Sequence, residues 1–144
     1  MEILFTATQA LLGTLGGVAL ALYSIVMTRW LVRRVARLEL LWWAGYLALA
    51  AWIYVGFALR EGGDGWMHVE LAGAAGYTAL AWLGVRRPPL LALGWLLHAG
   101  WDVVVHSDAP EGLVPSWYRW ACLGYDVAAA LYLVRLSARR AAST

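Results

Sequence analysis

The stretch from Ile3 to Thr28 contains no charged residue and is predominantly apolar. A helix needs about 20 apolar residues to cross the hydrocarbon core of a bilayer, and this stretch is long enough to do so. The rest of the chain has the same character, because 62% of the 144 residues are hydrophobic and only 14% are charged. A typical soluble domain has about 25% charged residues. The composition therefore predicts an integral membrane protein.

Turn signals divide the chain into five predicted helices. Glycine-rich and proline-containing segments at 60–65, 86–89 and 107–116 separate the apolar stretches, and an arginine cluster separates the first two. The expected transmembrane helices cover residues 3–30, 38–59, 66–85, 89–106 and 117–136. We therefore expect one all-α domain over residues 1–144, a polytopic integral membrane bundle of five transmembrane helices.

The arginines predict the orientation of this bundle. Nine of them gather at the ends that share one side of the membrane, at Arg29, Arg33, Arg34, Arg37, Arg86, Arg87, Arg135, Arg139 and Arg140. The positive-inside rule places this side in the cytoplasm, so the N-terminus is outside and the C-terminus inside a bacterial cytoplasmic (inner) membrane. A surface that binds anionic lipid is the alternative explanation. Nucleic-acid binding is not expected of a chain with so little soluble surface.

The fourth predicted helix contains three ionisable side chains, at His98, Asp102 and His106. Ionisable groups inside a bilayer are costly, so each of them needs a partner or a function. Two successive steps of four residues turn an α-helix by only about 80°, so the three side chains share one face. The fifth predicted helix carries Arg119 and Asp126, whose spacing also places both side chains on one face.

Depth along these two helices predicts which side chains meet. At a rise of about 1.5 Å per residue, His98 and Asp126 both lie about 12–13 Å below the outer ends of their helices. Asp102 and Arg119 lie about 3–6 Å below those ends. The two helices are consecutive and antiparallel, so we expect a hydrogen bond between His98 and Asp126. We also expect an ion pair between Asp102 and Arg119.

Further ionisable side chains lie near the helix ends. His68 and Glu70, at the outer end of the third predicted helix, are about 200° apart, so at most one can point at the same spot. Glu39 lies at the inner end of the second predicted helix, where we expect it to pair with Arg33 or Arg37. Apart from Glu39, these ionisable groups predict an outward-facing polar pocket.

One hypothesis for this pocket is a site for a divalent metal, zinc or iron. Histidine and aspartate are suitable ligands for both ions. His98 and His106 are about 12 Å apart along the helix axis, so one ion would bind Asp102 with only one of them. The candidate metal ligands are His98, Asp102, His106, His68 and Glu70, and the candidate catalytic residues are Asp102, Asp126 and Arg119. Such a site predicts a membrane-embedded hydrolase or oxidase whose substrate is a lipophilic small molecule.

Two alternatives explain the same residues. In the first, the cluster is a structural network that fixes the register of neighbouring helices and has no catalytic role. In the second, His98, Asp102 and Asp126 relay protons in a small proton-coupled or solute transporter. Few polar residues continue such a relay through the inner half of the bundle. Whether the chain is an enzyme is therefore left open by the sequence.

Small residues predict close helix packing. Gly13 and Gly17 form a GxxxG pattern in the first predicted helix, and Gly73 and Gly76 lie in the third. Such residues let two helices approach closely in a membrane. Packing within the chain is one interpretation, and a homodimer formed through Gly13 and Gly17 is the other.

The residues of the fourth and fifth predicted helices also carry a resemblance. The run His98-Ala99-x-Trp101-Asp102-x-x-x-His106, followed by Pro115-x-Trp117-Tyr118 and Asp126, resembles a pattern in small uncharacterised bacterial multi-pass membrane proteins. It covers residues 90–135 and implies a bacterial membrane protein, but no activity. Membrane ceramidase-like hydrolases, which place His and Asp around zinc at outer helix ends, are similar in a broad sense. This chain has five predicted spans instead of seven and lacks their full ligand pattern, so their chemistry is not transferred.

Overall fold

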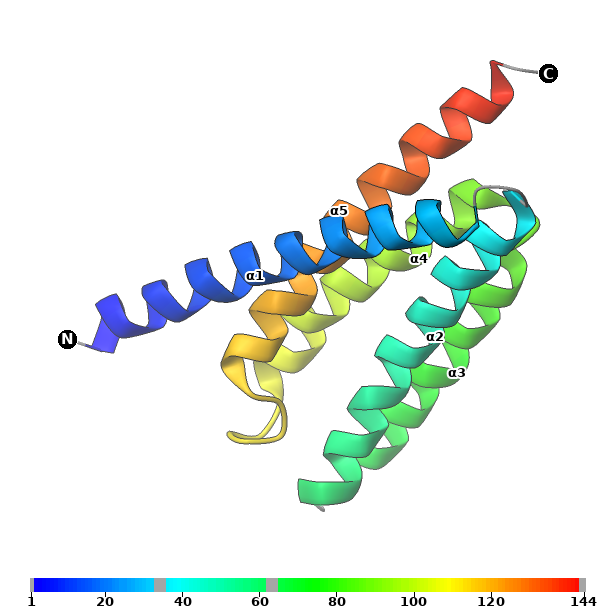
Figure 1. Ribbon diagram of the computed structural model, residues 1–144. Helices are drawn as coiled ribbons and strands as arrows, with labels where there is room; N and C mark the ends of the chain where they lie inside the picture. Colours follow the sequence, from blue (N-terminus) through cyan, green and yellow to red (C-terminus); the bar gives the residue numbers. More distant parts are fainter. Residues whose placement is uncertain (1, 33–35, 62–64, 143–144) are drawn as a thin grey trace.

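The computed structural model describes residues 2–32, 36–61 and 65–142, without the side chains of residues 2–5, 36 and 37. Within these ranges the regular structure is entirely helical, which confirms the all-α prediction. The long helices are α1 (Glu2–Leu31), α2 (Ala36–Glu61), α3 (Trp66–Gly84), α4 (Pro88–Gly100) and α5 (Ser116–Ala141) (Figure 1). Each predicted helix has its counterpart, and α5 extends beyond the predicted end at residue 136.

Four segments of the described chain are long and apolar enough to cross a membrane. They are Thr6–Leu31, Leu38–Glu61, Pro88–Asp108 and Ser116–Ala141. The third helix, α3, is not among them. It has 19 residues, several of them glycine, and it contains the buried acid Glu70, which lowers its mean hydropathy. The protein therefore has the helices of a membrane protein, and four of its described segments are long and apolar enough to cross a bilayer.

The fourth predicted helix changes its hydrogen-bonding pattern before it ends. Regular α-helix stops at Gly100 and continues as a π-helix, η1 (Trp101–Val105), and then as a 3₁₀ turn, η2 (His106–Asp108). Glycine and β-branched valine are weak helix formers. Gly100 ends the α-helical part, and Val103, Val104 and Val105 lie in the π-helix. Single-turn π-helices are rare and occur frequently at functional sites. The helix predicted over residues 89–106 is therefore present, but its last turns are not α-helical.

Helices α1 and α5 cross with their backbones in contact. A Cβ atom added to Gly17 would lie 1.9 Å from the carbonyl oxygen of Ala121, and one added to Gly124 would lie 2.2 Å from that of Thr14. A Cβ on Gly13 would also lie within 2.9 Å of α5 atoms. Gly13 and Gly17 thus pack within the chain, as the first interpretation of the GxxxG pattern proposed.

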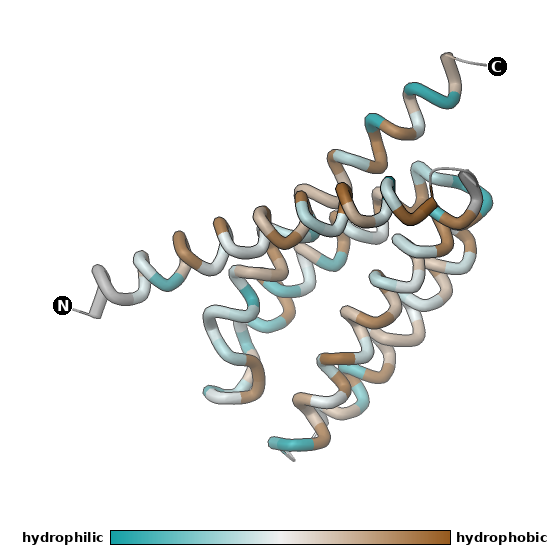
Figure 2. The backbone as a smooth tube through the Cα atoms, in the orientation of Figure 1, coloured by the Kyte–Doolittle hydropathy of each residue, from teal (hydrophilic) through white to brown (hydrophobic). Residues whose placement is uncertain are grey.

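The other helices form a row in which α5 packs on α4, α4 on α3, and α3 on α2. Aromatic side chains fill the space between them, and the indoles of Trp43 and Trp95 meet edge to face at 6.1 Å. Large apolar side chains cover much of the outer surface, including Leu12 and Val26 on α1. Figure 2 shows hydrophilic residues at the C-terminal end of α5 and at the turn between α3 and α4. Apolar side chains outside and ionisable side chains inside are the arrangement that lipid favours.

Candidate functional site

Five ionisable side chains are buried together inside the helical bundle. They come from α3, α4, η1, η2 and α5, and each is no more than 2% exposed: Glu70, His98, Asp102, His106 and Asp126. Burying charged groups is costly unless they are paired, hydrogen-bonded or bound to a metal. The predicted polar pocket is therefore present as a buried cluster, and the role of each member follows from its contacts.

The first contact of this cluster joins α4 to α5. Nδ1 of His98 lies 2.8 Å from Oδ2 of Asp126, and the imidazole donates its proton to the carboxylate. This hydrogen bond confirms the pairing that equal depth along the two helices predicts. It also fixes the imidazole so that the second ring nitrogen of His98, Nε2, points away from Asp126.

Asp102 makes a different contact from the predicted one. The hydroxyl of Tyr54, on α2, donates a hydrogen bond to Oδ1 of Asp102. Arg119 instead donates from Nη1 to the backbone carbonyl of His106, at 2.8 Å. The predicted ion pair between Asp102 and Arg119 was therefore wrong. Asp102 lies in the π-helix and contacts α2, and the guanidinium of Arg119 binds a carbonyl beyond the end of that π-helix.

His106 connects Glu70 to Asp102. Its Nε2 atom donates to Oε1 of Glu70 at 2.7 Å, and its Nδ1 atom lies 3.5 Å from Oδ1 of Asp102. The 3.5 Å contact is an electrostatic approach without hydrogen-bond geometry. His68, two residues before Glu70, is exposed and lies outside the cluster. Of the two predicted positions on α3, only Glu70 points inward, as their angular separation requires.

Aromatic rings enclose the imidazoles. The ring of Tyr54 stacks on that of His106 with centroids 4.6 Å apart, and Tyr77 meets His98 edge to face at 5.0 Å. Trp101 contacts Tyr77 edge to face. The sequence reasoning missed Tyr54 and Tyr77 because a tyrosine in an apolar helix looks like a packing residue. A phenol inside a predicted span was the available signal, since its hydroxyl needs a partner there.

Three polar atoms of the cluster lack a hydrogen-bond partner within the described part of the chain: Nε2 of His98, Oδ2 of Asp102 and Nδ1 of His106. More than 90% of buried polar groups in proteins have a partner, so each such atom needs an explanation. One ligating atom from each of His98, Asp102 and Asp126 lies within 4.8 Å of the other two. Ligand atoms around a tetrahedral zinc ion are about 3.4 Å apart, so modest side-chain rotation would bring a nitrogen of His98 and an oxygen of Asp102 to one ion. The donor set therefore fits a divalent metal.

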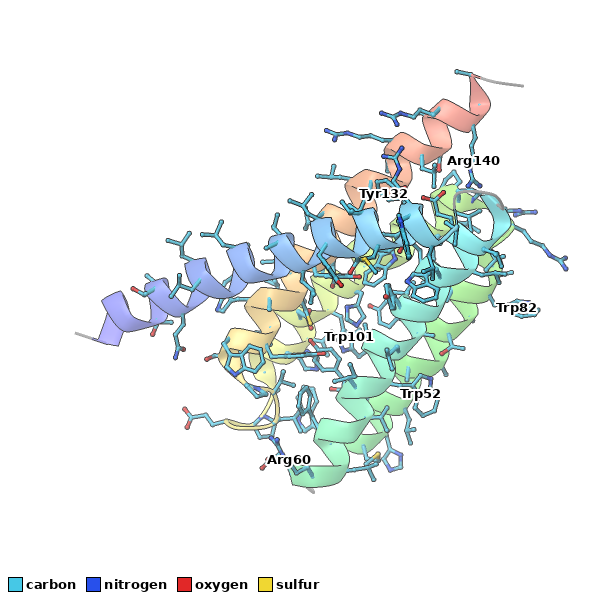
Figure 3. All side chains as sticks on the ribbon, viewed as in Figure 1. Trp52, Arg60, Trp82, Trp101, Tyr132 and Arg140 are labelled. Carbon is cyan, nitrogen blue, oxygen red and sulfur yellow. The ribbon has the colours of Figure 1, made fainter. Side chains whose placement is uncertain are left out.

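A shallow apolar groove lies beside the cluster. It has a volume of about 520 Å³, and α3, α4 and η1 line it with residues that include Gly73, Gly76, Tyr77, Gly100 and Trp101. Tyr77 and Trp101 both line this groove and contact the histidines of the cluster. Figure 3 places Trp101 among the helices of the bundle, whereas Trp82 points away from it. The side chains of Tyr77 and Trp101 thus lie between the buried histidines and the apolar groove.

A second, smaller polar contact lies at the opposite end of the bundle. Oε1 of Glu39 accepts a hydrogen bond from the hydroxyl of Tyr132, and Nη2 of Arg140 lies 3.5 Å from Oε2 (Figure 3). The side chains of Arg33 and Arg37, the predicted partners of Glu39, lie outside the described residues. Arg140 lies in the part of α5 that extends beyond residue 136. The predicted helix ended before it, so Arg140 was not predicted as a partner of Glu39.

These observations define an all-helical chain with four membrane-spanning candidate helices and a buried His/Asp cluster. The chain belongs to DUF6010, a family of unknown function, whose family model matches residues 11–139. That range includes every residue of the buried cluster. Comparisons with curated proteins and with solved structures give no match.

Proposed function

We propose that the protein crosses a bacterial cytoplasmic membrane five times, with its N-terminus outside and its C-terminus in the cytoplasm. Helix α3 is the proposed fifth span. Its 19 residues extend over about 28 Å, close to the hydrocarbon thickness of a bilayer, and it packs between α2 and α4. The positive-inside rule and the exposed arginines at one end of the bundle support the orientation.

We further propose that His98 and Asp102 bind a divalent metal, zinc or iron, in an outward-facing intramembrane site, with Asp126 as the hydrogen-bonded outer partner of His98. With this metal, the protein is a membrane-embedded hydrolase or oxidase that acts on a lipophilic small molecule. The observation that carries this proposal is the set of unpartnered buried atoms beside three side chains with converging ligating atoms. A metal ion satisfies such atoms, whereas a purely structural network is expected to satisfy its own members.

The surrounding residues fit this role. A bound divalent ion supplies Lewis acidity and activates water for hydrolysis, or supplies redox chemistry if it is iron. Asp126 orients the imidazole of His98 through the 2.8 Å hydrogen bond, in the way that carboxylates orient metal-binding histidines. His106, hydrogen-bonded to Glu70 and close to Asp102, is placed to hold and pass a proton beside the site. The apolar groove beside Trp101 gives a lipophilic substrate a route from the bilayer.

The transport alternative has less support from the packing. The buried cluster and the Glu39 contact lie at opposite ends of the bundle. Between them the core consists of side chains such as Trp43, Leu47 and Trp95, each no more than 1% exposed. A proton relay needs polar groups in sequence, and this part of the described core supplies aromatic and aliphatic ones.

Elemental analysis of protein purified in mild detergent tests the metal proposal. We expect about one zinc or iron ion per chain in the unmodified protein and in a His68→Ala control, which removes the exposed histidine. Asp102→Ala and His98→Ala should lose the ion. A protein that stays metal-free after incubation with either ion, and whose Asp102→Ala variant unfolds easily, would support the structural network instead. A pH-dependent proton flux in liposomes that Asp102→Ala abolishes, without any bound metal, would support transport.

A further inference from the structure

A wide groove separates the C-terminal halves of α1 and α5, away from the buried cluster. Beyond their crossing at Gly17 the two helices diverge (Figure 1), and the groove between them has a volume of about 1340 Å³. Its walls are formed by residues between Leu22 and Val32, at the C-terminal end of α1, and by residues between Ala128 and Arg139 of α5, with Glu39 of α2 at one side. The proposed metal site takes no part in it.

The lining of this groove changes from apolar to cationic along its length. The part nearer the helix crossing is lined by aliphatic side chains, among them Leu22, Val26 and Leu131, which are more than half exposed. The part nearer the C-terminal ends of both helices is lined by Arg29, Arg135 and Arg139. Ala128 and Arg139 are eleven residues apart on α5, which corresponds to about 16 Å. An occupant of this groove must therefore be apolar along most of its length and anionic at one end.

The charges of the groove are not balanced within the described chain. Glu39, the acid in the lining, is bound by Tyr132 and lies 3.5 Å from Arg140. Arg29, Arg135 and Arg139 form no ion pair with any described acid. Arg135 and Arg139 are four residues apart on one helix face, where like charges repel each other. An anion bound between them would remove this repulsion.

We propose that this groove binds an anionic phospholipid, with the phosphate at Arg29, Arg135 and Arg139 and the acyl chains against Leu22, Val26 and Leu131. Guanidinium groups bind phosphate oxygens through paired hydrogen bonds, and the basic residues that line the groove are all arginines. Basic pockets between transmembrane helices on the cytoplasmic side bind anionic headgroups. The positive-inside orientation places the groove at that leaflet. The proposal is independent of any metal.

Two matched double variants test this proposal. Arg135→Gln with Arg139→Gln removes two charges from the groove, and Arg86→Gln with Arg87→Gln removes two exposed arginines from the turn between α3 and α4. Phosphatidylglycerol binding to the detergent-purified protein is measured by native mass spectrometry, against phosphatidylcholine with the same acyl chains and against glycerol phosphate. We expect the groove variant to weaken phosphatidylglycerol binding about tenfold or more, and the turn variant to change it less than about twofold.

A steric variant separates the groove from general charge attraction. Val26→Trp fills the apolar part of the groove and leaves every arginine in place, so it should also weaken phosphatidylglycerol binding. Equal losses in the two arginine variants would overturn the proposal, because net charge alone would then attract the lipid. Equal binding of phosphatidylcholine, or binding of glycerol phosphate as tight as that of the lipid, would overturn it as well. Far-UV circular dichroism confirms that each variant keeps its helices.

Discussion

The imidazole of His98 donates a 2.8 Å hydrogen bond to the carboxylate of Asp126, and this contact joins α4 to α5 where both side chains are almost fully buried. The contact leaves Nε2 of His98 without a partner among the described residues. Carboxylates that orient a metal-binding histidine in this way fix which ring nitrogen faces the ion. The pair is therefore the orienting half of the proposed metal site.

Asp126→Asn tests this relationship with little change of shape. The amide oxygen can still accept the hydrogen bond from His98, but the negative charge is lost. We expect metal affinity to fall about 10–100-fold, the range seen when outer partners of metal ligands are changed, while the protein still folds. Competition with a fluorescent chelator measures the affinity. Asp108→Asn, at an exposed acid near the same end of the bundle, is the control and should leave affinity unchanged. Unchanged affinity in Asp126→Asn would remove Asp126 from the site.

Tyr54→Phe tests the contact that the sequence did not predict. The substitution removes the hydroxyl that donates to Asp102 and leaves a buried carboxylate with one partner fewer. Losing a hydrogen bond to a buried polar group costs about 1–3 kcal/mol, so the thermal midpoint should fall. Tyr23→Phe, at a tyrosine that is 61% exposed, is the matched control and should have little effect. If both variants melt at the same temperature, the hydroxyl of Tyr54 does not stabilise Asp102.

Gly17→Ala tests the contact between α1 and α5. The new methyl group would meet the carbonyl oxygen of Ala121 at 1.9 Å, so the helices must separate. We expect a loss of about 2 kcal/mol or more in the free energy of unfolding. Gly16→Ala is the control, because its methyl group would meet nothing within 4 Å and alanine favours the helix. Similar stability of the two variants would contradict the packing of α1 on α5.

Arg119→Gln separates a positioning role from a catalytic one. In the structure the guanidinium donates to the carbonyl of His106, and among the described residues it forms no hydrogen bond or ion pair with a proposed ligand side chain. We expect the variant to lose about 1–2 kcal/mol of stability and to keep its metal. Arg60→Gln, at an exposed arginine that pairs with its neighbour Glu61, is the control. Loss of the metal in Arg119→Gln at unchanged stability would assign Arg119 to the site itself.

Much of the fold could be predicted because spans, turns and depth depend on local features of the sequence. Apolar length and turn residues predicted five helices, and equal depth predicted the contact between His98 and Asp126. Equal depth also predicted an ion pair between Asp102 and Arg119, but each of these side chains has another partner. Depth assumes the regular rise of an α-helix, whereas Asp102 lies in the π-helix at Trp101–Val105. Gly100 and the following valines carry a weak signal for that π-helix.

Contacts between helices that are far apart in the sequence could not be predicted either. The bond from Tyr54 to Asp102 joins α2 to η1, and the Glu39 contact joins α2 to the extended end of α5. Neither follows from periodicity, because both depend on how the helices cross. The intrachain role of Gly13 and Gly17 was one of two open interpretations, and only the position of α5 distinguishes them.

Anomalous scattering at the zinc absorption edge, recorded from crystals of zinc-loaded protein, tests the central claim most directly. The account predicts one strong peak inside the bundle, within bonding distance of His98 and Asp102, and no such peak in the Asp102→Ala variant. A peak between Glu70 and His106, or no ordered zinc beside His98 in protein saturated with the ion, would contradict it.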